Sequence, residues 1–465
     1  MSKKLPERLQ ALLQNLEQGL VERRQSVRLC LLAALAGEHS LLIGPPGTAK
    51  SALARRLHSA FGPVAYFERL LTRFTVPEEL FGPLSLRALE EDRYERHTAG
   101  FLPNASIAFI DEVFKANSAI LNALLTLLNE REFDNGATRM ACPLISVLGA
   151  TNHVPEDEVA DAFFDRFLLR LPVEPVSAQG FARLLQLPQG PAWHAPEASL
   201  QLDAQTLQQL AASAASVALP DSVLQPLGEL RLHCQSLALV VSDRRWVKAL
   251  GLLRVAAASE GRSALAPWDL LLLPWLCAPD APRQAALADW LVTRLGVHQG
   301  FAPTRLTRLV EAFARQLDTE LQANDLDYDA SGRLNFTAQD LAGAIGDAKG
   351  GAAALRMHAQ RRRRYGQTHI DARVRQIDEL LLRIEGYAHE VAALAADLQA
   401  YTQGSLWLDA TLLQGAAANL GATATAVAQL AERSQALRLG FLALPRLEQD
   451  NGIAPEPLDA EEATP

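Results

Sequence analysis

Short apolar runs that end in polar residues are the clearest pattern in the first third of the chain. Residues 41–43 are Leu-Leu-Ile, followed by a glycine-rich stretch and then by the helix-forming segment ALARRL. Residues 107–110 and 144–150 are further, largely apolar runs, which end in Asp-Glu and Thr-Asn. Runs of this kind are typical of buried parallel strands. The pattern predicts an α/β fold with a parallel sheet between helices.

Helical periodicity dominates the remainder of the chain. Leucine and alanine recur at helical spacing from about 199 to 300, after a stretch rich in proline and glycine near residues 175–196. Further helices are predicted over residues 304–323, 374–398 and 408–436. The predicted domains are an α/β core over 1–190, a helical domain over 191–303, a helical arm over 304–445 with a short irregular insertion near 324–350, and an acidic disordered tail over 446–465.

Composition and charge narrow the class of protein. The 465 residues are 49% apolar, which is enough for several domains with their own cores. No apolar run is long enough to span a membrane, and the N-terminus reads as an amphipathic helix, so a cytoplasmic protein is expected. The four cysteines lack CxxC spacing, which indicates buried thiols. A net charge of −9 disfavours nonspecific binding to nucleic acid.

The stretch after the first apolar run has the features of a phosphate-binding loop. Backbone N–H groups can surround phosphates, the lysine can neutralise their charge, the serine can bind magnesium, and the following helix adds its dipole. Alanine stands before the lysine, where the motif usually has glycine, and alanine is expected to avoid a left-handed backbone there. An ordinary helix start would also give Lys-Ser after a glycine turn. The loop residues are Gly44, Pro45, Pro46, Gly47, Thr48, Ala49, Lys50 and Ser51.

Polar residues at the ends of the next two strands complete a candidate nucleotide site. Asp111 and Glu112 follow the second apolar run, where buried carboxylates need a cation or a polar partner. Asp111 suits the magnesium shell, and Glu112 suits the polarising of an attacking water. Asn152, after the third run, could orient that water. A surface loop that begins with two acids is the alternative, but together with the glycine loop the residues favour nucleotide hydrolysis.

Two arginines in the next segment are candidates for a contact with a neighbouring subunit. Arg166 and Arg170 are four residues apart, so they would share one face of a helix, although the end of this segment could equally be a strand. An exposed arginine at the rim of a nucleotide subunit can serve as a finger to the neighbour's phosphate. A local ion pair with Asp161 or Asp165 is the alternative.

With these elements in order, the chain resembles the AAA+ ATPases, and in particular their MoxR branch. The phosphate loop with Ala49 is similar to that of the branch, and residues 72–105 look like its helix-two insert. The resemblance continues through residues 241–250 and 261–273, so it covers roughly the first three hundred residues. It implies a P-loop core with this insert, an α-helical lid and a C-terminal helical arm.

The resemblance also implies roles for the candidate residues. It makes Asp111 and Glu112 the Walker B pair and Asn152 the first sensor. The finger would be Arg166 before Arg170, and the second sensor, in a lid that closes over the nucleotide, would be Arg244 before Arg245. Adenine contacts are expected around residues 20–24, without a side chain that identifies itself.

Function and partners follow as expectations from the same resemblance. The chain should hydrolyse ATP with Mg²⁺ in a ring, most simply a hexamer, and remodel a client protein in a chaperone-like role. MoxR proteins are commonly paired with von Willebrand factor A domain proteins, which makes such a protein the expected partner. One subgroup of the branch carries a β domain within its arm for partner binding, and here that interval is short. A nucleic-acid-dependent motor and a nucleotide switch with little turnover are the alternatives.

Two motifs in the last third are weak. Residues 327–338 resemble a calcium loop but end in Ala338 instead of glutamate, so a polar loop is favoured. The run Arg361 to Arg364 could bind an anion, but a solvated helix face is the more usual explanation.

Overall fold

The computed structural model of the chain describes residues 4–152, 162–187, 193–295, 303–323, 363–450 and 452–458. The chain forms two compact units, Met1–Leu295 with Leu398–Ala416, and Gly296–Asp397 with Ala417–Pro465. The predicted insertion near 324–350, the calcium-like loop and two arginines of the run at 361–364 lie outside the described residues. No described helix is long and apolar enough to cross a membrane.

The first unit is built on a five-stranded sheet with the strand order β2-β3-β6-β1-β7. Every neighbouring pair in this sheet is parallel. Its strands are β1 (Ser40–Ile43), β2 (Tyr66–Leu70), β3 (Ile107–Asp111), β6 (Ser146–Thr151) and β7 (Leu169–Pro172). The three apolar runs of the sequence are thus β1, β3 and β6, which lie side by side at the centre of the sheet, and the predicted α/β fold is confirmed.

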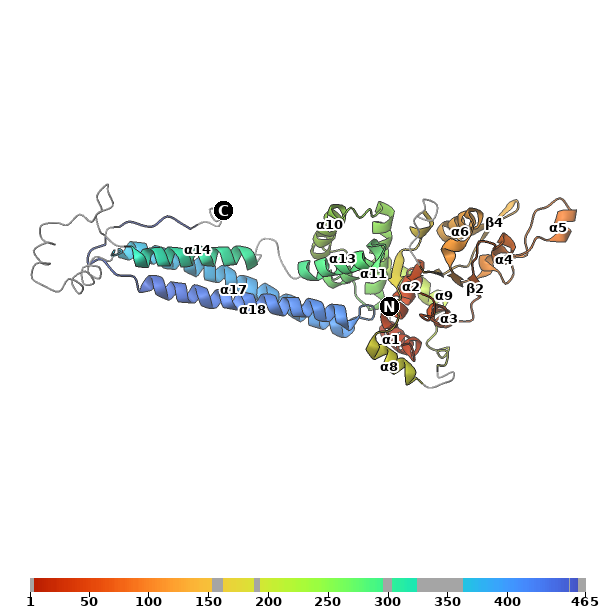
Figure 1. The fold of residues 1–465 in the computed structure, drawn as a ribbon, viewed down its shortest axis with the longest axis horizontal. Helices are drawn as coiled ribbons and strands as arrows, with labels where there is room; N and C mark the ends of the chain where they lie inside the picture. Colours follow the sequence, from red (N-terminus) through yellow and green to blue (C-terminus); the bar gives the residue numbers. More distant parts are fainter. Residues whose placement is uncertain are drawn as a thin grey trace, which may run out of the picture. The chain divides into compact units, whose positions relative to one another are not determined.

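Helices cover the sheet because each has an apolar face. Helices α2 (Arg24–Leu35) and α3 (Lys50–Ser59) pack against strands of the sheet (Figure 1). In α6 (Ser118–Glu130), Ile120, Leu124 and Leu127 are fully buried at the spacing of one helical face. Burial of both faces explains why β3 is apolar until Asp111 and why β6 is apolar between its first residue, Ser146, and its last, Thr151. The buried hydroxyl of Ser146 donates to the Glu38 carbonyl (2.7 Å).

Smaller elements decorate this core. The insert between β2 and β3 contains α4 (Pro77–Phe81) and α5 (Leu86–Glu90), and β4 (Glu132–Asn135) and β5 (Thr138–Ala141) form a hairpin after α6. Helix α1 (Lys4–Glu17) packs against α2, and α8 (Ala178–Leu185) follows β7. The sequence left open whether the segment at 161–171 ends as a helix or as a strand. In the structure it ends in strand β7, so Arg166 and Arg170 do not share a helix face.

The lid follows as a set of helices within the same unit. They are α9 (Ala204–Ala215), α10 (Asp221–Ser236), α11 (Asp243–Ser259), α12 (Leu273–Cys277) and α13 (Ala281–Arg294). Helix α11 packs against both α9 and α2, so the lid also contacts the core.

The arm consists of α14 (Pro303–Gln322), α17 (Gln367–Gly404) and α18 (Ala410–Leu442) (Figure 1). The tip of the α17–α18 hairpin belongs to the first unit. There, Trp407 is buried and its Nε1 donates to Ser259 Oγ of the lid (2.9 Å), while its carbonyl accepts from Gln25 Nε2 of α2 (2.8 Å). Tyr401 donates to the buried carboxylate of Asp269 (2.9 Å). The tip therefore contacts both the core and the lid.

Candidate functional site

The glycine-rich loop connects β1 to α3 at the carboxyl edge of the sheet. Gly44 has no space for a side chain, since an added Cβ would lie 2.2 Å from the Val173 carbonyl oxygen. Gly47 has φ +82° and open space around it. Lys50 is the first residue of α3, so the helix N-terminus points at the loop. This arrangement suits a bound phosphate.

Ala49 corrects one expectation from the sequence. Its φ of 67° and ψ of 24° are left-handed, although alanine was expected to avoid that conformation. A left-handed backbone costs a residue with a Cβ about 1–2 kcal/mol. The surrounding loop holds Ala49 in the conformation that a glycine would adopt without strain.

Lys50 is folded into the loop. Its side chain is buried, and Nζ donates to the carbonyl oxygens of Gly44 (2.7 Å) and Pro45 (2.9 Å). Burial lowers the pKa of Lys50, and the nearby charges of Asp111 and Glu112 partly oppose this shift. Gly44, to which Lys50 is bonded, also donates through its N–H to the carbonyl of Thr151 at the end of β6 (3.0 Å), so the lysine lies at the strand ends that carry the acidic pair and Asn152.

The acidic pair and the asparagine meet at the same edge of the sheet. Because β3 and β6 are adjacent and parallel, their carboxyl ends coincide. Asn152 Nδ2 donates to Glu112 Oε1 (2.7 Å), and Lys115 Nζ lies 3.3 Å from the same oxygen. Asp111 Oδ1 accepts from the N–H of Glu112 (3.0 Å). Three of the predicted site residues are thus brought together.

The donor set fits a magnesium ion that is held mainly by phosphate and water. Among the described residues there is no group of three or more His, Cys, Asp or Glu that could hold a metal. Mg²⁺ at nucleotide sites usually needs only one or two protein oxygens, since it keeps several waters and binds substrate phosphates. Ser51 and Asp111, both partly exposed, are the oxygen donors that suit this role.

Arg23 and Lys115 are site residues that sequence reasoning missed. Arg23 is buried, and its Nε donates to the Thr48 carbonyl (3.1 Å) while Nη2 donates to the Glu174 carbonyl (2.6 Å). It therefore joins the phosphate loop to the segment after β7. No sequence pattern within residues 20–24 distinguishes Arg23 from the adjacent Arg24. In the structure, Arg24 pairs instead with Glu17 on the surface (2.7 Å).

The two finger candidates have different surroundings. Arg170 is buried in β7, where its guanidinium lies 3.9 Å from the centre of the Phe164 ring. Arg166 is a quarter exposed and lies 3.8 Å from Asp165. Burial, followed by the charge of Arg244, lowers the pKa of Arg166. The side chain of Arg166 is more exposed than that of Arg170, which is only 7% exposed, so Arg166 is the better placed of the two for a contact with an incoming group.

The two second-sensor candidates also differ. Arg245 is buried, and all five of its N–H groups are used: they donate to the Asp165 carboxylate and to the carbonyls of Asp165, Phe167, Leu168 and Leu276 at 2.6–3.2 Å. Arg244 is exposed and donates to Asn129 Oδ1 (2.9 Å). Arg245 therefore fastens the lid to the core, and Arg244 remains accessible.

Arg166, Arg244 and Lys248 line one surface depression, which we call the basic cluster. The cluster lies at the amino edge of the sheet, because Arg166 precedes β7 and Lys248 pairs with Glu38, which precedes β1 (2.6 Å). The phosphate loop begins at the other edge, beyond the four residues of β1, which span about 13 Å at ~3.3 Å per residue. Within one chain, the basic cluster and the phosphate loop are thus on opposite edges.

Comparison with known proteins finds two family profiles along the chain. Residues 7–212 match the MoxR domain in the MoxR-vWA-beta-propeller ternary systems, and residues 222–291 match an AAA lid domain. The first range contains the sheet-containing core and most of α9, and the second runs from α10 into α13 of the lid.

Individual relatives agree with the profiles. The uncharacterized proteins MJ0079 and MJ0812 of Methanocaldococcus jannaschii are 37% identical over 268 residues and 38% identical over 267 residues. Each match covers 57% of this chain, and 69% and 70% of those two proteins. Protein MoxR of Paracoccus denitrificans is 27% identical over 161 residues, which are 33% of this chain and 46% of that protein.

Proposed function

This chain belongs to the MoxR family of AAA+ ATPases, and from that premise we propose that it hydrolyses ATP with Mg²⁺ at the carboxyl edge of its sheet. The observation that carries the proposal is the meeting of Asp111, Glu112 and Asn152 at the edge where the phosphate loop begins. The Gly44 N–H donates to the Thr151 carbonyl (3.0 Å), and Lys50 Nζ donates to the Gly44 carbonyl (2.7 Å). Packing alone gives no reason for two carboxylates, an amide and a buried lysine to converge at the end of adjacent strands.

Each residue has a defined task in this proposal. Lys50 would exchange its bonds to the loop carbonyls for phosphate oxygens, and Ser51 and Asp111 would hold the magnesium ion. When bound, Mg²⁺ neutralises charge that develops on the phosphates. Glu112 orients and polarises the attacking water, and Asn152 fixes the Glu112 carboxylate through its amide.

The basic cluster supports a site that is shared between subunits. Arg166 and Arg244 are on the opposite edge from the phosphate loop of their own chain, so they are placed to act on a neighbour's nucleotide in a head-to-tail ring. We propose Arg166 as the finger and Arg244 as the second sensor, both acting in trans in a hexamer. Arginine fingers supplied by a neighbour raise phosphoryl-transfer rates by about 10³ to 10⁵.

The proposed output is mechanical work on a client protein in the cytoplasm. The matched family profile is named for systems with a vWA protein, and a vWA domain protein is therefore the proposed partner. We further propose that the chain is closest to regulatory ATPase variant A (RavA), with its partner-binding β domain shortened or absent, because the likeness continues through residues 241–250 and 261–273.

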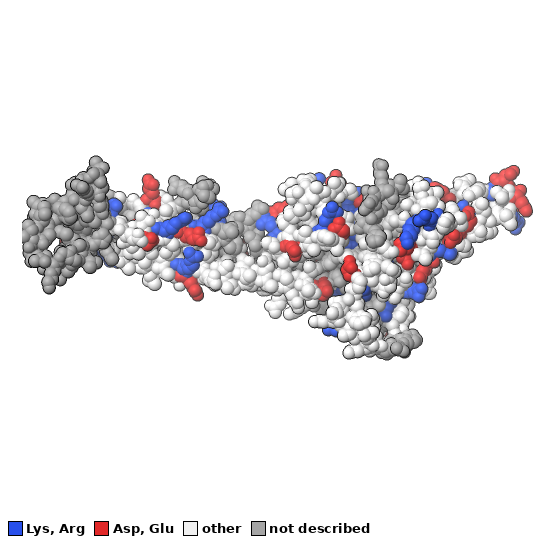
Figure 2. Space-filling model, viewed as in Figure 1, with Lys and Arg blue, Asp and Glu red and all other residues white. Residues whose placement is uncertain are grey.

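A nucleic-acid motor is the less favoured candidate. The net charge is −9, and Figure 2 shows Lys and Arg side chains interspersed with Asp and Glu on the visible face. Affinity for nucleic acid comes mainly from contiguous positive charge. Strong stimulation of hydrolysis by DNA or RNA would reverse this preference.

Complementation between two inactive variants tests the shared site. Glu112→Gln lacks the residue that polarises the water, and Arg166→Ala lacks the finger, so each should lose ATP hydrolysis when alone. Glu112→Gln still has an intact basic cluster, and Arg166→Ala still has an intact Walker B pair. Mixed in equal amounts, they should regain activity, because roughly a quarter of head-to-tail interfaces then combine an intact Glu112 with an intact Arg166. Arg231→Ala, which removes an exposed lid arginine outside the basic cluster, is the matched control and should keep full activity. Activity that is not restored by mixing contradicts the shared site.

A further inference from the structure

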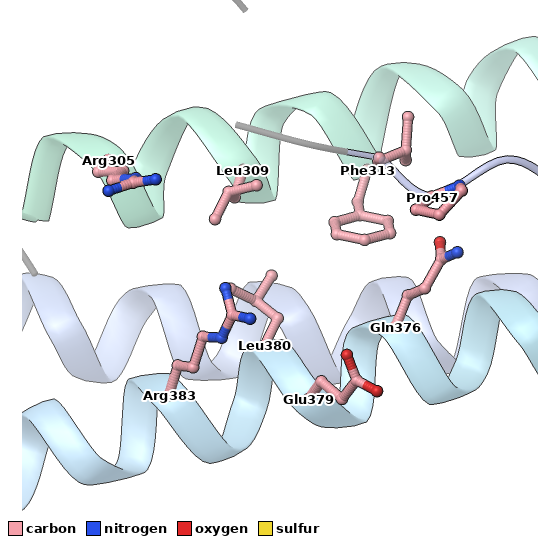
Figure 3. Close-up of a pocket in the computed structure, with 9 residues that line it drawn as sticks. Arg305, Leu309, Phe313, Gln376, Glu379, Leu380, Arg383 and Pro457 are labelled. Atoms are coloured by element: carbon pink, nitrogen blue, oxygen red, sulfur yellow. The ribbon is translucent and has the colours of Figure 1, made fainter. Parts of the chain in front are cut away.

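A groove lies between helices α14 and α17 of the second unit. Leu309 and Phe313 of α14 and Leu380 of α17 form its apolar floor, and all three are at most 9% exposed. Arg305 and Arg383 are further along the same groove (Figure 3). The cavity has a volume of about 160 Å³. Four of the nine lining residues, Arg305, Gln376, Glu379 and Arg383, are polar or charged, so the groove is apolar only at its floor. Its volume is similar to the ~150 Å³ that holds a benzene ring in a wholly apolar cavity, so there is room for a leucine or phenylalanine side chain.

The C-terminal segment of the chain covers this groove without filling it. Residues 452–458 form neither helix nor strand, and Pro457 and Leu458 line the cavity. Arg373 Nη1 donates to the Glu456 carbonyl (2.9 Å), which holds the segment by its backbone. Ile453 is 63% exposed, so little of its side chain is buried. The segment is thus a loosely packed cover over a site that still has unfilled volume.

The net positive charge of the groove favours a ligand with acidic side chains. Among the described lining residues, Arg305 and Arg383 outnumber the single carboxylate of Glu379. The sequence from Ile453 onward, IAPEPLDAEEATP, has four acidic residues, two prolines before Leu458, and no basic residue. Prolines favour an extended backbone, which lowers the entropy lost on binding. The chain's own C-terminal sequence is therefore an example of the extended, acidic peptide that would complement the groove.

We propose that the groove between α14 and α17 is a peptide-binding site, covered by the chain's own C-terminal segment until an extended acidic peptide of a partner protein, presenting a leucine or phenylalanine, displaces it. The site is separate from the nucleotide site and does not depend on hydrolysis. Its ligand is recognised by one apolar anchor and by acidic side chains near Arg305 and Arg383.

Fluorescence anisotropy with a labelled peptide IAPEPLDAEEATP tests the proposal. The chain that ends at Asp450 should bind the peptide saturably, and the full chain should bind about tenfold more weakly because its own segment competes. Arg383→Glu should weaken binding, and so should a peptide with alanine in place of its leucine, by about tenfold or more. Arg375→Glu, an exposed arginine of α17 that does not line the groove, is the matched control and should leave binding unchanged.

A second comparison does not depend on truncation. The full chain with Leu458→Ala should bind the labelled peptide more tightly than the parent, since its cover is weakened while the groove is intact. The proposal is overturned if the shortened chain does not bind the peptide, if Arg383→Glu and Arg375→Glu have equal effects, or if a scrambled peptide of the same composition binds equally well.

Discussion

Replacing Arg245 tests whether its hydrogen bonds between the lid and the core stabilise the fold. Arg245→Ala removes five hydrogen bonds and leaves the carbonyls of Phe167, Leu168 and Leu276 without these donors in a buried environment. The side chain of Asp165 is 37% exposed, so water can replace the arginine there. Water cannot reach the buried carbonyls as easily. Removing one member of a buried charged network costs about 3–5 kcal/mol, and the access of water to Asp165 favours the lower end.

Arg244→Ala is the matched comparison on the neighbouring residue. Arg244 is exposed and makes one hydrogen bond, to Asn129, so its loss should change the free energy of unfolding by less than about 0.5 kcal/mol. If Arg244 is the second sensor, ATP hydrolysis should nevertheless fall. Arg245→Ala should instead lower the thermal midpoint by roughly 6 °C or more, at ~2 °C per kcal/mol for a unit of this size.

The assay is thermal unfolding of both variants by circular dichroism, with ATP hydrolysis measured at 25 °C. Arg245→Lys adds an internal test, since lysine keeps the charge but has three donors for five acceptors, and it should give an intermediate midpoint. The reasoning fails if Arg245→Ala lowers the midpoint by less than 2 °C, or if Arg244→Ala lowers it by as much as Arg245→Ala.

Three further predictions concern the loop, the water-activating pair and the tip of the arm. Ala49→Gly should relieve about 1–2 kcal/mol of left-handed strain and lose about 0.4–1 kcal/mol through unfolded-state entropy, so urea unfolding should show a small net stabilisation. Asn152→Ala should lower kcat by about 10²-fold with ATP affinity unchanged, measured by steady-state kinetics and nucleotide titration. Burial raises the pKa of Glu260 to about 7, so the native state holds its proton more tightly than the unfolded state, and the stability from this group is lost as pH rises from about 4.5 to 7. Glu260→Gln should therefore gain stability relative to the parent over that range, by up to about 3 kcal/mol in denaturant titrations, and a constant difference would contradict the shift.

The strands were predictable because their pattern is local. The apolar runs of β1, β3 and β6 end in the polar residues that the site uses, so their order and their shared edge follow from burial of a parallel sheet. The left-handed backbone of Ala49 was not predictable, because the surrounding loop overrides a preference that belongs to one residue. The same holds for Arg245, whose five acceptors come from two segments distant in the sequence.

The position of the basic cluster was the most consequential feature that the sequence left open. The motif around residues 241–250 indicated that Arg244 or Arg245 would belong to a lid, but only the packing of α11 against the start of β7 determines which edge of the sheet they face. Spacing along the chain contains no information about that edge. Both arginines lie at the amino edge, away from the phosphate loop of their own chain. Our proposal for Arg244 therefore concerns the nucleotide of a neighbouring subunit and not the nucleotide of its own chain.

The lid contacts the core through Arg245 and the arm tip through Trp407. The phosphate loop is at one edge of the sheet and the basic cluster at the other. In the ring that we propose, a nucleotide at a subunit interface would therefore contact the core of one chain and the lid of the next. The lid is fastened to its own core through Arg245, and the arm tip is fastened to both, through Ser259 of the lid and Gln25 of α2. Any displacement of the lid relative to α2 must therefore break or shift the bonds of Trp407. The arm tip is thus the part of the hairpin that a movement of the lid against α2 would disturb.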